Sequence, residues 1–266
     1  MKFPEWTMAK LSAYIMTFNE EDKIGDAIAS IDWADEVVVA DSFSTDKTAE
    51  IAESMGARVV QIPFEGFGKL RNQAIATCSH QWIFSLDADE RCTEAARTEI
   101  QKIIADPEAL DVYYVPRRNF FLGRWIKHSG WYPDYRQPQL FRQGALSFTD
   151  EDEVHEGFTV HGRIGHMQQF ILQIPFKDLS QMVHKMQRYS SLGSNKLERN
   201  GVEASLGKAF LHGFGAFVRF YILKRGFLDG WAGFVIALGN FEGTFYRYAK
   251  LAERQHQLNI PSPPPE

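Results

Sequence analysis

Short apolar stretches alternate with amphipathic stretches over the first 115 residues of the chain. The apolar stretches lie at residues 11–17, 35–41, 57–63 and 81–87. Their nearly continuous apolar character is typical of strands that are covered on both faces. The amphipathic stretches lie at residues 20–31, 44–56, 68–79 and 93–106. Strands that alternate with helices of about a dozen residues predict βαβ units and a mainly parallel sheet.

The pattern changes in the second half of the chain. Residues 112–176 mix short apolar runs with Gly, Pro and aromatic residues, which predicts short strands and long loops able to hold a second substrate. Residues 177–199 have helical periodicity, and residues 203–254 predict two or three helices of high apolar content. The last stretch, "NIPSPPPE", is rich in proline and predicts a disordered tail.

The composition is that of an ordinary globular protein, with 44% hydrophobic and 24% charged residues. The formal net charge of −5 argues against general binding of nucleic acid, which requires a basic surface. The cysteines, Cys78 and Cys92, are too few for a disulfide framework and fit a reducing compartment. The first residues lack a charged start followed by a long apolar core, so we expect no signal peptide.

Polar and acidic residues gather where the predicted strands end. Ligands of open parallel sheets bind beyond the carboxyl ends of the strands, so these residues are candidates for a binding site. They are Thr17, Asn19, Glu20, Asp41, Asp87 and Asp89. Asp41 has no capping role in the local pattern and could accept hydrogen bonds from a base or a ribose.

The stretch "WIFSLDADERC" at residues 82–92 runs an apolar strand into three carboxylates. In an extended chain Asp87 and Asp89 project to the same side, and such a pair is favourable when a divalent cation joins the carboxylates. Mg²⁺ or Mn²⁺ that bridges a diphosphate would serve, because these ions prefer oxygen ligands. The alternative is a helix N-terminus, where the helix dipole favours acidic residues such as Glu90.

The stretch "FEGFGKLRNQA" adds positive charge at the start of the third predicted helix. Gly66 and Gly68, with Lys69 and Arg71, suit a phosphate or a nucleotide at a helix N-terminus. The alternative is a solvated helix face that happens to carry two cations.

Together these stretches resemble family 2 glycosyltransferases of the GT-A fold. The matching pieces are "TFNEEDKI", "ADEVVVADSFSTDKTAEIAESMGA", "GFGKLRNQA", "WIFSLDADER", "GWYPD" and "VHE", in order and spacing as well as wording, over residues 11–160. The C-terminal "YILKRGFLDGWAGFVIALGNFEGTFYRYAKL" is similar to that of a bacterial subgroup, enzymes like the lipopolysaccharide core β-1,4-glucosyltransferases.

The resemblance implies an α/β GT-A fold, a Rossmann-like and mainly parallel sheet with helices on both faces. It implies an inverting transfer of a hexose, with glucose from UDP-glucose as the best choice. The implied domains are a catalytic domain over 1–176 (nucleotide-sugar half 1–111, acceptor half 112–176), a helical extension over 177–258 and a tail over 259–266.

The resemblance also implies roles for single residues. Asp89 should bind Mg²⁺ or Mn²⁺, Asp87 should approach the ribose, and Arg71 should contact the base or the diphosphate. The other expected contacts of the nucleotide-sugar are Thr17, Asn19, Glu20, Asp41 and Lys69. The expected acceptor side is Trp131, Tyr132 and Asp134.

The catalytic base should come from "TDEDEVHEGF", residues 149–158. Most of its carboxylates are expected to form a solvated acidic loop. Glu156 is the first choice, because "VHE" carries the resemblance, and Asp152 and Glu153 are the alternatives. His155 could orient the site, although a lone histidine is often structural.

One residue departs from the pattern of the family. Related enzymes often place a histidine after the acidic loop, where it completes the metal site, and this chain has Gln173 there. His166 or His184 could take its place.

The C-terminal apolar stretches, residues 209–223 and 226–239, are too short to span a membrane, which requires about 20 apolar residues. Aromatic residues interleaved with Lys and Arg are typical of helices that lie in a membrane interface. We expect residues 203–254 to contact the cytoplasmic face of the inner membrane, where a lipid-linked or lipopolysaccharide-core acceptor would lie. The alternatives are packing on the catalytic domain or a homodimer interface.

Two other functions remain open on the sequence. A nucleotidyltransferase would need a Gly-rich loop after the first strand, where this chain has "FNEEDKIG". A non-catalytic, membrane-bound scaffold on the same fold is disfavoured by the intact pair Asp87 and Asp89, whereas Gln173 leaves it open.

Overall fold

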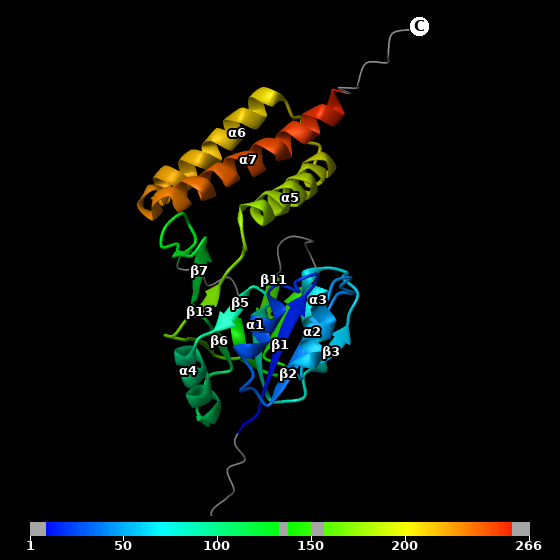
Figure 1. Ribbon diagram of the computed structural model, residues 1–266, viewed down its shortest axis with the longest axis vertical. Coiled ribbons are helices and arrows are strands. Elements are labelled where there is room, and N and C mark those ends of the chain that lie inside the picture. Colours follow the sequence, from blue (N-terminus) through cyan, green and yellow to red (C-terminus); the bar gives the residue numbers. More distant parts are fainter. Residues whose placement is uncertain (1–8, 133–137, 150–156, 257–266) are drawn as a thin grey trace, which may run out of the picture. The chain divides into compact units, whose positions relative to one another are not determined.

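The computed structural model describes residues 9–132, 138–149 and 157–256, which form two compact units (Figure 1). The first unit, called the sheet unit here, contains the described residues up to 118 and those between 138 and 174. The second, called the helical unit, contains residues 119–132 and 175–256. A stretch from the middle of the sequence therefore belongs with the C-terminal helices.

The sheet unit is built on a seven-stranded sheet with the order β12-β6-β9-β4-β1-β2-β3. Its parallel part consists of β1 (Leu11–Thr17), β2 (Glu36–Asp41), β3 (Arg58–Gln61) and β4 (Trp82–Asp87). The remaining strands are β6 (Val112–Tyr114), β9 (Pro138–Arg142) and β12 (Ile164–His166). Only β9 runs antiparallel to its neighbours, β4 and β6. The predicted fold class, a mainly parallel α/β sheet of the GT-A kind, is confirmed.

Helices cover both faces of this sheet because successive side chains of a strand point to opposite faces. Ala13 and Ile15 of β1 belong to one core cluster, together with residues of α1 (Ile24–Ala29), α2 (Thr48–Ser54) and α4 (Glu94–Ala105). Tyr14, between them, belongs to a second cluster with α3 (Phe67–Thr77). The continuous apolar strands of the sequence are thus explained by burial on both sides.

Short strands occur in the described parts of residues 112–176, as their mixed composition predicts. A four-stranded sheet has the order β5-β13-β7-β8, where β5 is Glu90–Cys92, β7 Arg117–Phe121, β8 Arg124–Trp125 and β13 Ile171–Gln173. A separate antiparallel pair joins β10 (Leu146–Thr149) and β11 (Gly157–Val160).

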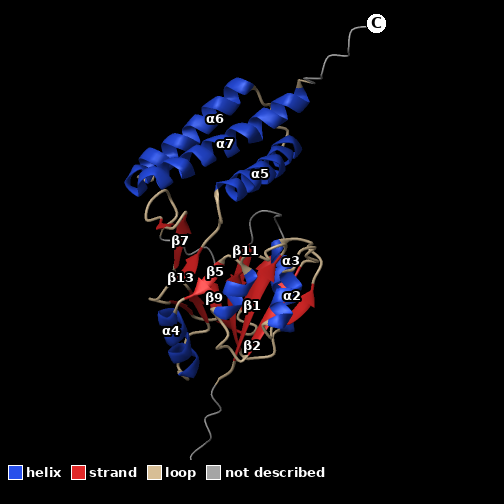
Figure 2. Ribbon diagram, in the orientation of Figure 1, coloured by secondary structure: helices blue, strands red, loops and turns tan. Residues whose placement is uncertain are grey.

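The helical unit contains three long helices, α5 (Leu179–Arg199), α6 (Leu206–Val218) and α7 (Gly230–Gln255) (Figure 2). Between α6 and α7 the chain makes a π-helical turn at Arg219–Leu223 and a 3₁₀ turn at Gly226–Asp229. Arg225 and Gly230 adopt left-handed φ angles of 55° and 66°, which interrupts the helical path. None of the helices in the described ranges combines the length and the apolar character that crossing a membrane requires.

One carboxylate ties the amino-terminal ends of the parallel strands together. Glu36 of β2 accepts hydrogen bonds from Ser12 of β1, from Arg58 of β3 at 2.7 Å, and from Ser79 before β4. Burial raises the pKa of Glu36, but these donors outweigh burial and lower the pKa to about 2.

Replacing this carboxylate with Glu36→Gln should lower the free energy of unfolding by about 1–2 kcal/mol at pH 7. Because the folded pKa lies below the ordinary value of 4.5, the contribution is present above pH 4.5 and is lost as the pH falls toward 2. Urea unfolding at several pH values would measure it, with Glu53→Gln on the exposed side of α2 as a control. A difference between wild type and Glu36→Gln that stays constant from pH 7 to pH 3 would contradict the assignment.

Candidate active site at the carboxyl ends of the parallel strands

The strand-end residues predicted from the sequence lie at one edge of the sheet. Thr17 and Asp41 are cross-strand partners at the ends of β1 and β2, and Asp87 at the end of β4 is the partner of Met16. The carboxyl ends of three adjacent strands therefore bring polar side chains to the same edge, the usual ligand site of such sheets.

A buried arginine supplies the positive charge at this edge. Arg71 of α3 is only 4% exposed, and one guanidinium nitrogen lies 3.3 Å from a carboxylate oxygen of Asp87. Another donates to the Ser85 hydroxyl at 3.2 Å. Burial raises the pKa of the adjacent Tyr14 phenol, and the Arg71 charge opposes that shift. The alternative of a solvated helix face is therefore wrong for Arg71.

Lys69, two residues earlier, differs from Arg71. Its side chain is 46% exposed and forms an ion pair with Glu65 at 3.3 Å, which is itself exposed. Such a pair contributes little to stability, so Lys69 is available to an anionic ligand at small cost.

Asp87 and Asp89 lie at a tight turn between β4 and β5. Asp87 ends β4 and Asp89 lies in the turn before β5, so the chain is not extended through both residues as the sequence argument supposed. The backbone carbonyl of Asp89 accepts a hydrogen bond from the amide of Ile174 at 2.8 Å, and its carboxylate is 3.4 Å from the amide nitrogen of Gln173. Gln173 thus lies next to the carboxylate predicted to bind metal.

A buried ion pair between Glu90 and Arg117 stabilises this turn. Glu90 is fully buried, and one of its oxygens accepts from Arg117 at 2.8 Å. The other oxygen accepts from the Gln139 amide at 2.8 Å and from the backbone amide of Asp87 at 3.0 Å. Burial, followed by the Asp87 charge, raises the pKa of Glu90 to about 7, whereas Arg117 acts to lower it.

The interpretation of Glu90 as a helix-start residue is wrong. Glu90 lies in β5, and α4 begins only at Glu94, where the Thr93 hydroxyl caps the helix by accepting from the Ala96 amide at 3.1 Å. A three-residue strand paired to β13, far away in the sequence, leaves no local signal that distinguishes it from a helix start.

The loop after β2 is organised by Asp41. This fully buried carboxylate accepts hydrogen bonds from both the amide and the hydroxyl of Ser44. Asn19 has a left-handed conformation with φ of 54°. Its backbone N–H donates to the Ser44 hydroxyl, and its side-chain oxygen accepts from the backbone N–H of Thr45. Glu20 pairs with Lys23 at 3.0 Å. Asp41 therefore has a local structural partner, contrary to the sequence expectation.

Two buried hydroxyls at the same edge have no hydrogen-bond partner among the described residues. The side-chain oxygens of Thr17 and Ser42 are buried and make no hydrogen bond within the described ranges. Buried polar groups are normally satisfied, so an unsatisfied pair at a strand edge is typical of a functional site.

The residues present fit a divalent cation that arrives with its own phosphate ligands. No cluster of three or more His, Cys, Asp or Glu side chains suited to a metal occurs among the described residues. Asp87 and Asp89 supply two carboxylates, and Mg²⁺ or Mn²⁺ is commonly held by one or two carboxylates together with phosphate oxygens and water. Among the described residues, the neighbouring Glu90 carboxylate is already paired with Arg117 at 2.8 Å.

Several predicted residues lie outside the described residues. They are the base candidates Glu156, Asp152 and Glu153, together with His155 and Asp134. Of the two histidines considered in place of Gln173, His166 stacks on Tyr114 with ring centroids 5.2 Å apart, and His184 lies on α5 in the helical unit.

The expected acceptor residues Trp131 and Tyr132 belong to the helical unit. The Trp131 carbonyl accepts from the Asn119 side chain at 2.7 Å, and the rings of Tyr132 and Trp125 meet edge to face. The preceding loop is fixed by Asp229, a buried carboxylate that accepts from the amides of residues 127 and 128 and from the Ser129 hydroxyl at 2.9 Å.

Sequence reasoning missed Arg117, Gln139 and Asp229. Nothing in "VPRRNFF" distinguishes a buried arginine from a surface one. The lone acid in "GFLDGW" was a usable signal, because an unpaired carboxylate among apolar residues must find donors if it is buried.

Comparison with known proteins gives consistent matches over most of the chain. Residues 12–171 match the family described as Glycosyl transferase family 2. The chain is 28% identical to the lipopolysaccharide core biosynthesis glycosyltransferase LpsC of Rhizobium meliloti (strain 1021), and the alignment covers 92% of each chain. It is 29% identical to an uncharacterized glycosyltransferase of Rickettsia bellii (strain RML369-C), with 94% of this chain and 88% of the relative covered. Among solved structures, S. aureus TarS matches with 17% identity and a TM-score of 0.49, over 93% of this chain and 91% of that chain.

The buried pair yields a stability prediction. Arg117→Met should lower the free energy of unfolding by about 3–5 kcal/mol, because it leaves the Glu90 carboxylate buried without its cation. Adding Glu90→Gln should recover at least about 1 kcal/mol relative to the sum of the single changes. Urea unfolding would measure this cycle, with Arg97→Met at the exposed pair with Glu94 as a control. Additive single effects would show that the two side chains do not interact.

Proposed function

This chain belongs to glycosyl transferase family 2, and we propose that it transfers a hexose with inversion from a UDP-sugar to a lipid-linked or lipopolysaccharide-core glycan. UDP-glucose is the preferred donor. The observation that carries the proposal is the buried Arg71 beside Asp87 at the carboxyl edge of the parallel strands, with Asp89 in the adjoining turn.

The donor would lie along this edge. Asp87 accepts from a ribose hydroxyl, while Arg71 fixes the orientation of the Asp87 carboxylate and adds positive potential for the diphosphate. The unsatisfied hydroxyls of Thr17 and Ser42 supply hydrogen-bonding capacity at the nucleoside end. The loop held by Asp41 closes the same end.

Asn19, Glu20 and Lys69 are also proposed to contact the sugar donor. Asn19 and Glu20 sit in the loop bonded to residues 44–48, beside the nucleoside end. Lys69 is exposed and able to reach an anion.

Asp89 would hold the divalent cation, with the Gln173 side-chain amide next to it. The cation, Mg²⁺ or Mn²⁺, would supply charge neutralisation for the departing diphosphate. The amides of Ile174 and Asp87 and the buried Glu90 keep the turn in place, so the carboxylates need little reorganisation.

The acceptor hydroxyl must lose its proton to a positioned base and lie in line behind the anomeric carbon. Glu156 is proposed as the base, with Asp152 and Glu153 as alternatives and His155 as an orienting group. Trp131, Tyr132 and Asp134 are proposed to contact the acceptor. No covalent protein nucleophile is required for an inverting transfer.

A lipid-bound acceptor fits the surface of the helical unit. The relative from Rhizobium meliloti is described as a lipopolysaccharide core enzyme. Large apolar side chains between 45% and 72% exposed gather on α6, the turns after it and the start of α7. They are Leu206, Phe210, Leu211, Phe214, Ile222, Leu223, Phe227, Leu228, Trp231 and Phe234.

Basic residues accompany this apolar set. Residues 201–254 hold seven Lys or Arg and four Asp or Glu. Apolar and basic side chains together suit a membrane interface with anionic lipid. We therefore propose peripheral attachment to the cytoplasmic face of the inner membrane; a homodimer interface is the competing use of the same surface.

Removing the carboxylate at position 89 tests the metal role. Asp89→Asn should reduce Mg²⁺- or Mn²⁺-dependent release of UDP from the UDP-sugar in the presence of acceptor by at least about a hundredfold, since charge neutralisation of the leaving group contributes several kcal/mol. Asp32→Asn, on the exposed surface, is the matched control. Wild-type turnover that is indifferent to EDTA would reject the metal, and UDP binding without any transfer would favour the scaffold function.

Introducing negative charge at two of the exposed apolar residues tests membrane contact. The double variant Leu211→Asp and Leu223→Asp should lose flotation with vesicles of phosphatidylethanolamine and phosphatidylglycerol, because both side chains are at least 70% exposed and their substitution spares the core. The control Met55→Asp and Ile164→Asp adds the same charge to exposed positions of the sheet unit. Equal flotation of the two double variants would exclude this surface as the membrane contact.

A further inference from the structure

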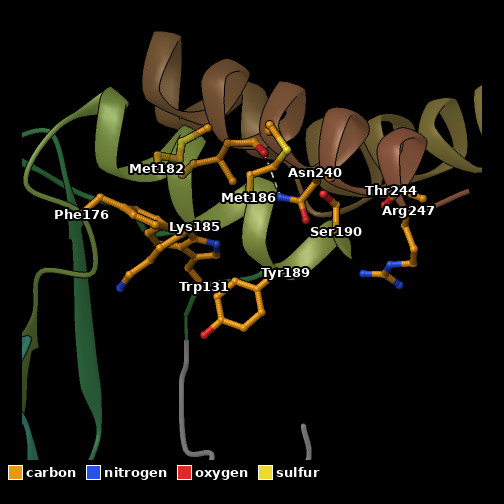
Figure 3. A pocket seen from close by; sticks show the side chains of 13 residues that line it. Trp131, Phe176, Met182, Lys185, Met186, Tyr189, Ser190, Asn240, Thr244 and Arg247 are labelled. Atoms are coloured by element: carbon orange, nitrogen blue, oxygen red, sulfur yellow. Dashed lines mark hydrogen bonds between the residues drawn. The ribbon is translucent and has the colours of Figure 1, made fainter. Parts of the chain in front are cut away.

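The helical unit contains a pocket of about 230 Å³ between α5 and α7 (Figure 3). All of its lining residues belong to this unit. Met182 and Met186 of α5 and Ile236 of α7 form its apolar wall, and Trp131 and Phe176 close one end. The pocket is therefore separate from the strand-end site in sequence and in elements.

Glycines on α7 create the close helix packing beside the pocket. A Cβ atom at Gly239 would lie 2.5 Å from the terminal methyl of Met182, and one at Gly243 would lie 3.4 Å from Met186. The flexible, polarisable methionine side chains can rearrange around an inserted apolar chain with little strain. This wall thus suits an aliphatic ligand of variable shape.

Among the described residues that line the pocket, two are cations and none is an acid. Figure 3 shows Lys185 and Arg247 at opposite ends of the pocket, with Tyr189 between them. Within the described ranges the Lys185 ammonium donates to the Pro175 carbonyl alone, at 3.2 Å, and it lies over the Phe176 ring. The positive charge of the pocket is not neutralised by its own lining.

Arg247 differs from the neighbouring cations of its helix. Lys250 donates to Ser190 at 2.8 Å, and Arg254 pairs with Glu198 at 2.9 Å, so both have structural partners. Arg247 forms no ion pair or hydrogen bond with any residue in the described part of the chain. A guanidinium beside an apolar wall, without a partner, is suited to an external anion such as a phosphate.

We propose that this pocket binds a phosphorylated amphiphile, with the aliphatic chain along the methionine wall, the phosphate held by Arg247, and Lys185 at the other end of the pocket adding positive potential. The charge complementarity favours a phosphate-bearing lipid over a neutral one. The proposal deepens the proposed function and rests on it in one respect, since the amphiphile would be the acceptor class on which the sheet unit acts.

The test uses the full chain and isothermal titration calorimetry with dodecyl phosphate below its critical micelle concentration. Wild type should bind it saturably, and Lys185→Gln with Arg247→Gln should weaken binding by about tenfold or more. The matched control Lys208→Gln with Arg219→Gln removes the same charge outside the pocket and should change affinity less than twofold. Thr244→Trp, which fills the pocket, should abolish binding; thermal unfolding checks that each variant is folded.

Two further probes decide what is recognised. Inorganic phosphate that binds as tightly as dodecyl phosphate would overturn the proposal in favour of a free-anion site. Dodecyl maltoside that binds as tightly would overturn it in favour of an unselective apolar groove. Equal weakening by the pocket and control variants would also overturn it, because only overall charge would then matter.

The inference and the proposed function fail separately. Asp89→Asn should keep dodecyl phosphate binding while it loses transfer. Absent binding with intact transfer would remove the pocket proposal alone, and intact binding with no metal-dependent transfer by wild type would remove the proposed function alone.

Discussion

The candidate site at the carboxyl ends of the parallel strands depends on a carboxylate that is buried away from water. Glu90 is buried beneath the Asp87–Asp89 turn and is held there by Arg117, by Gln139 and by the amide of Asp87. An ion pair of this kind costs desolvation free energy, so its value lies less in net stability than in defining one geometry. The geometry it defines is that of the two carboxylates proposed to meet ribose and metal.

Arg71 provides the second constraint on this turn. It belongs to α3 and reaches the end of β4, where it meets Ser85 and Asp87. Asp87 is therefore held through its amide by Glu90 and through its side chain by Arg71. A carboxylate fixed in this way is already organised before any ligand binds, which is the condition for efficient electrostatic recognition.

The alternation of apolar and amphipathic stretches was enough to predict the parallel sheet, because burial on both faces leaves a strong local signal. For β1 the predicted and observed bounds coincide at Leu11–Thr17, and β4 differs by one residue. The sequence did not predict the structural partners of Glu90 and Asp41, because these partners are set by tertiary pairing and loop geometry. β5 exists only through β13, and the donors from Ser44 appear only when the chain after β2 turns back.

The hydrogen bonds of the Asp229 carboxylate limit which parts of this chain could be exchanged with another protein during evolution. The carboxylate accepts hydrogen bonds from the backbone amides of residues 127 and 128 and from the Ser129 hydroxyl, so this segment depends on a residue that lies 100 positions after Ser129 in the chain. The C-terminal helices are therefore not a detachable module. A recombination event that exchanged them for the helices of another protein would leave buried donors unsatisfied unless it also exchanged residues 119–132. The two stretches should be inherited together, as one unit of evolutionary change.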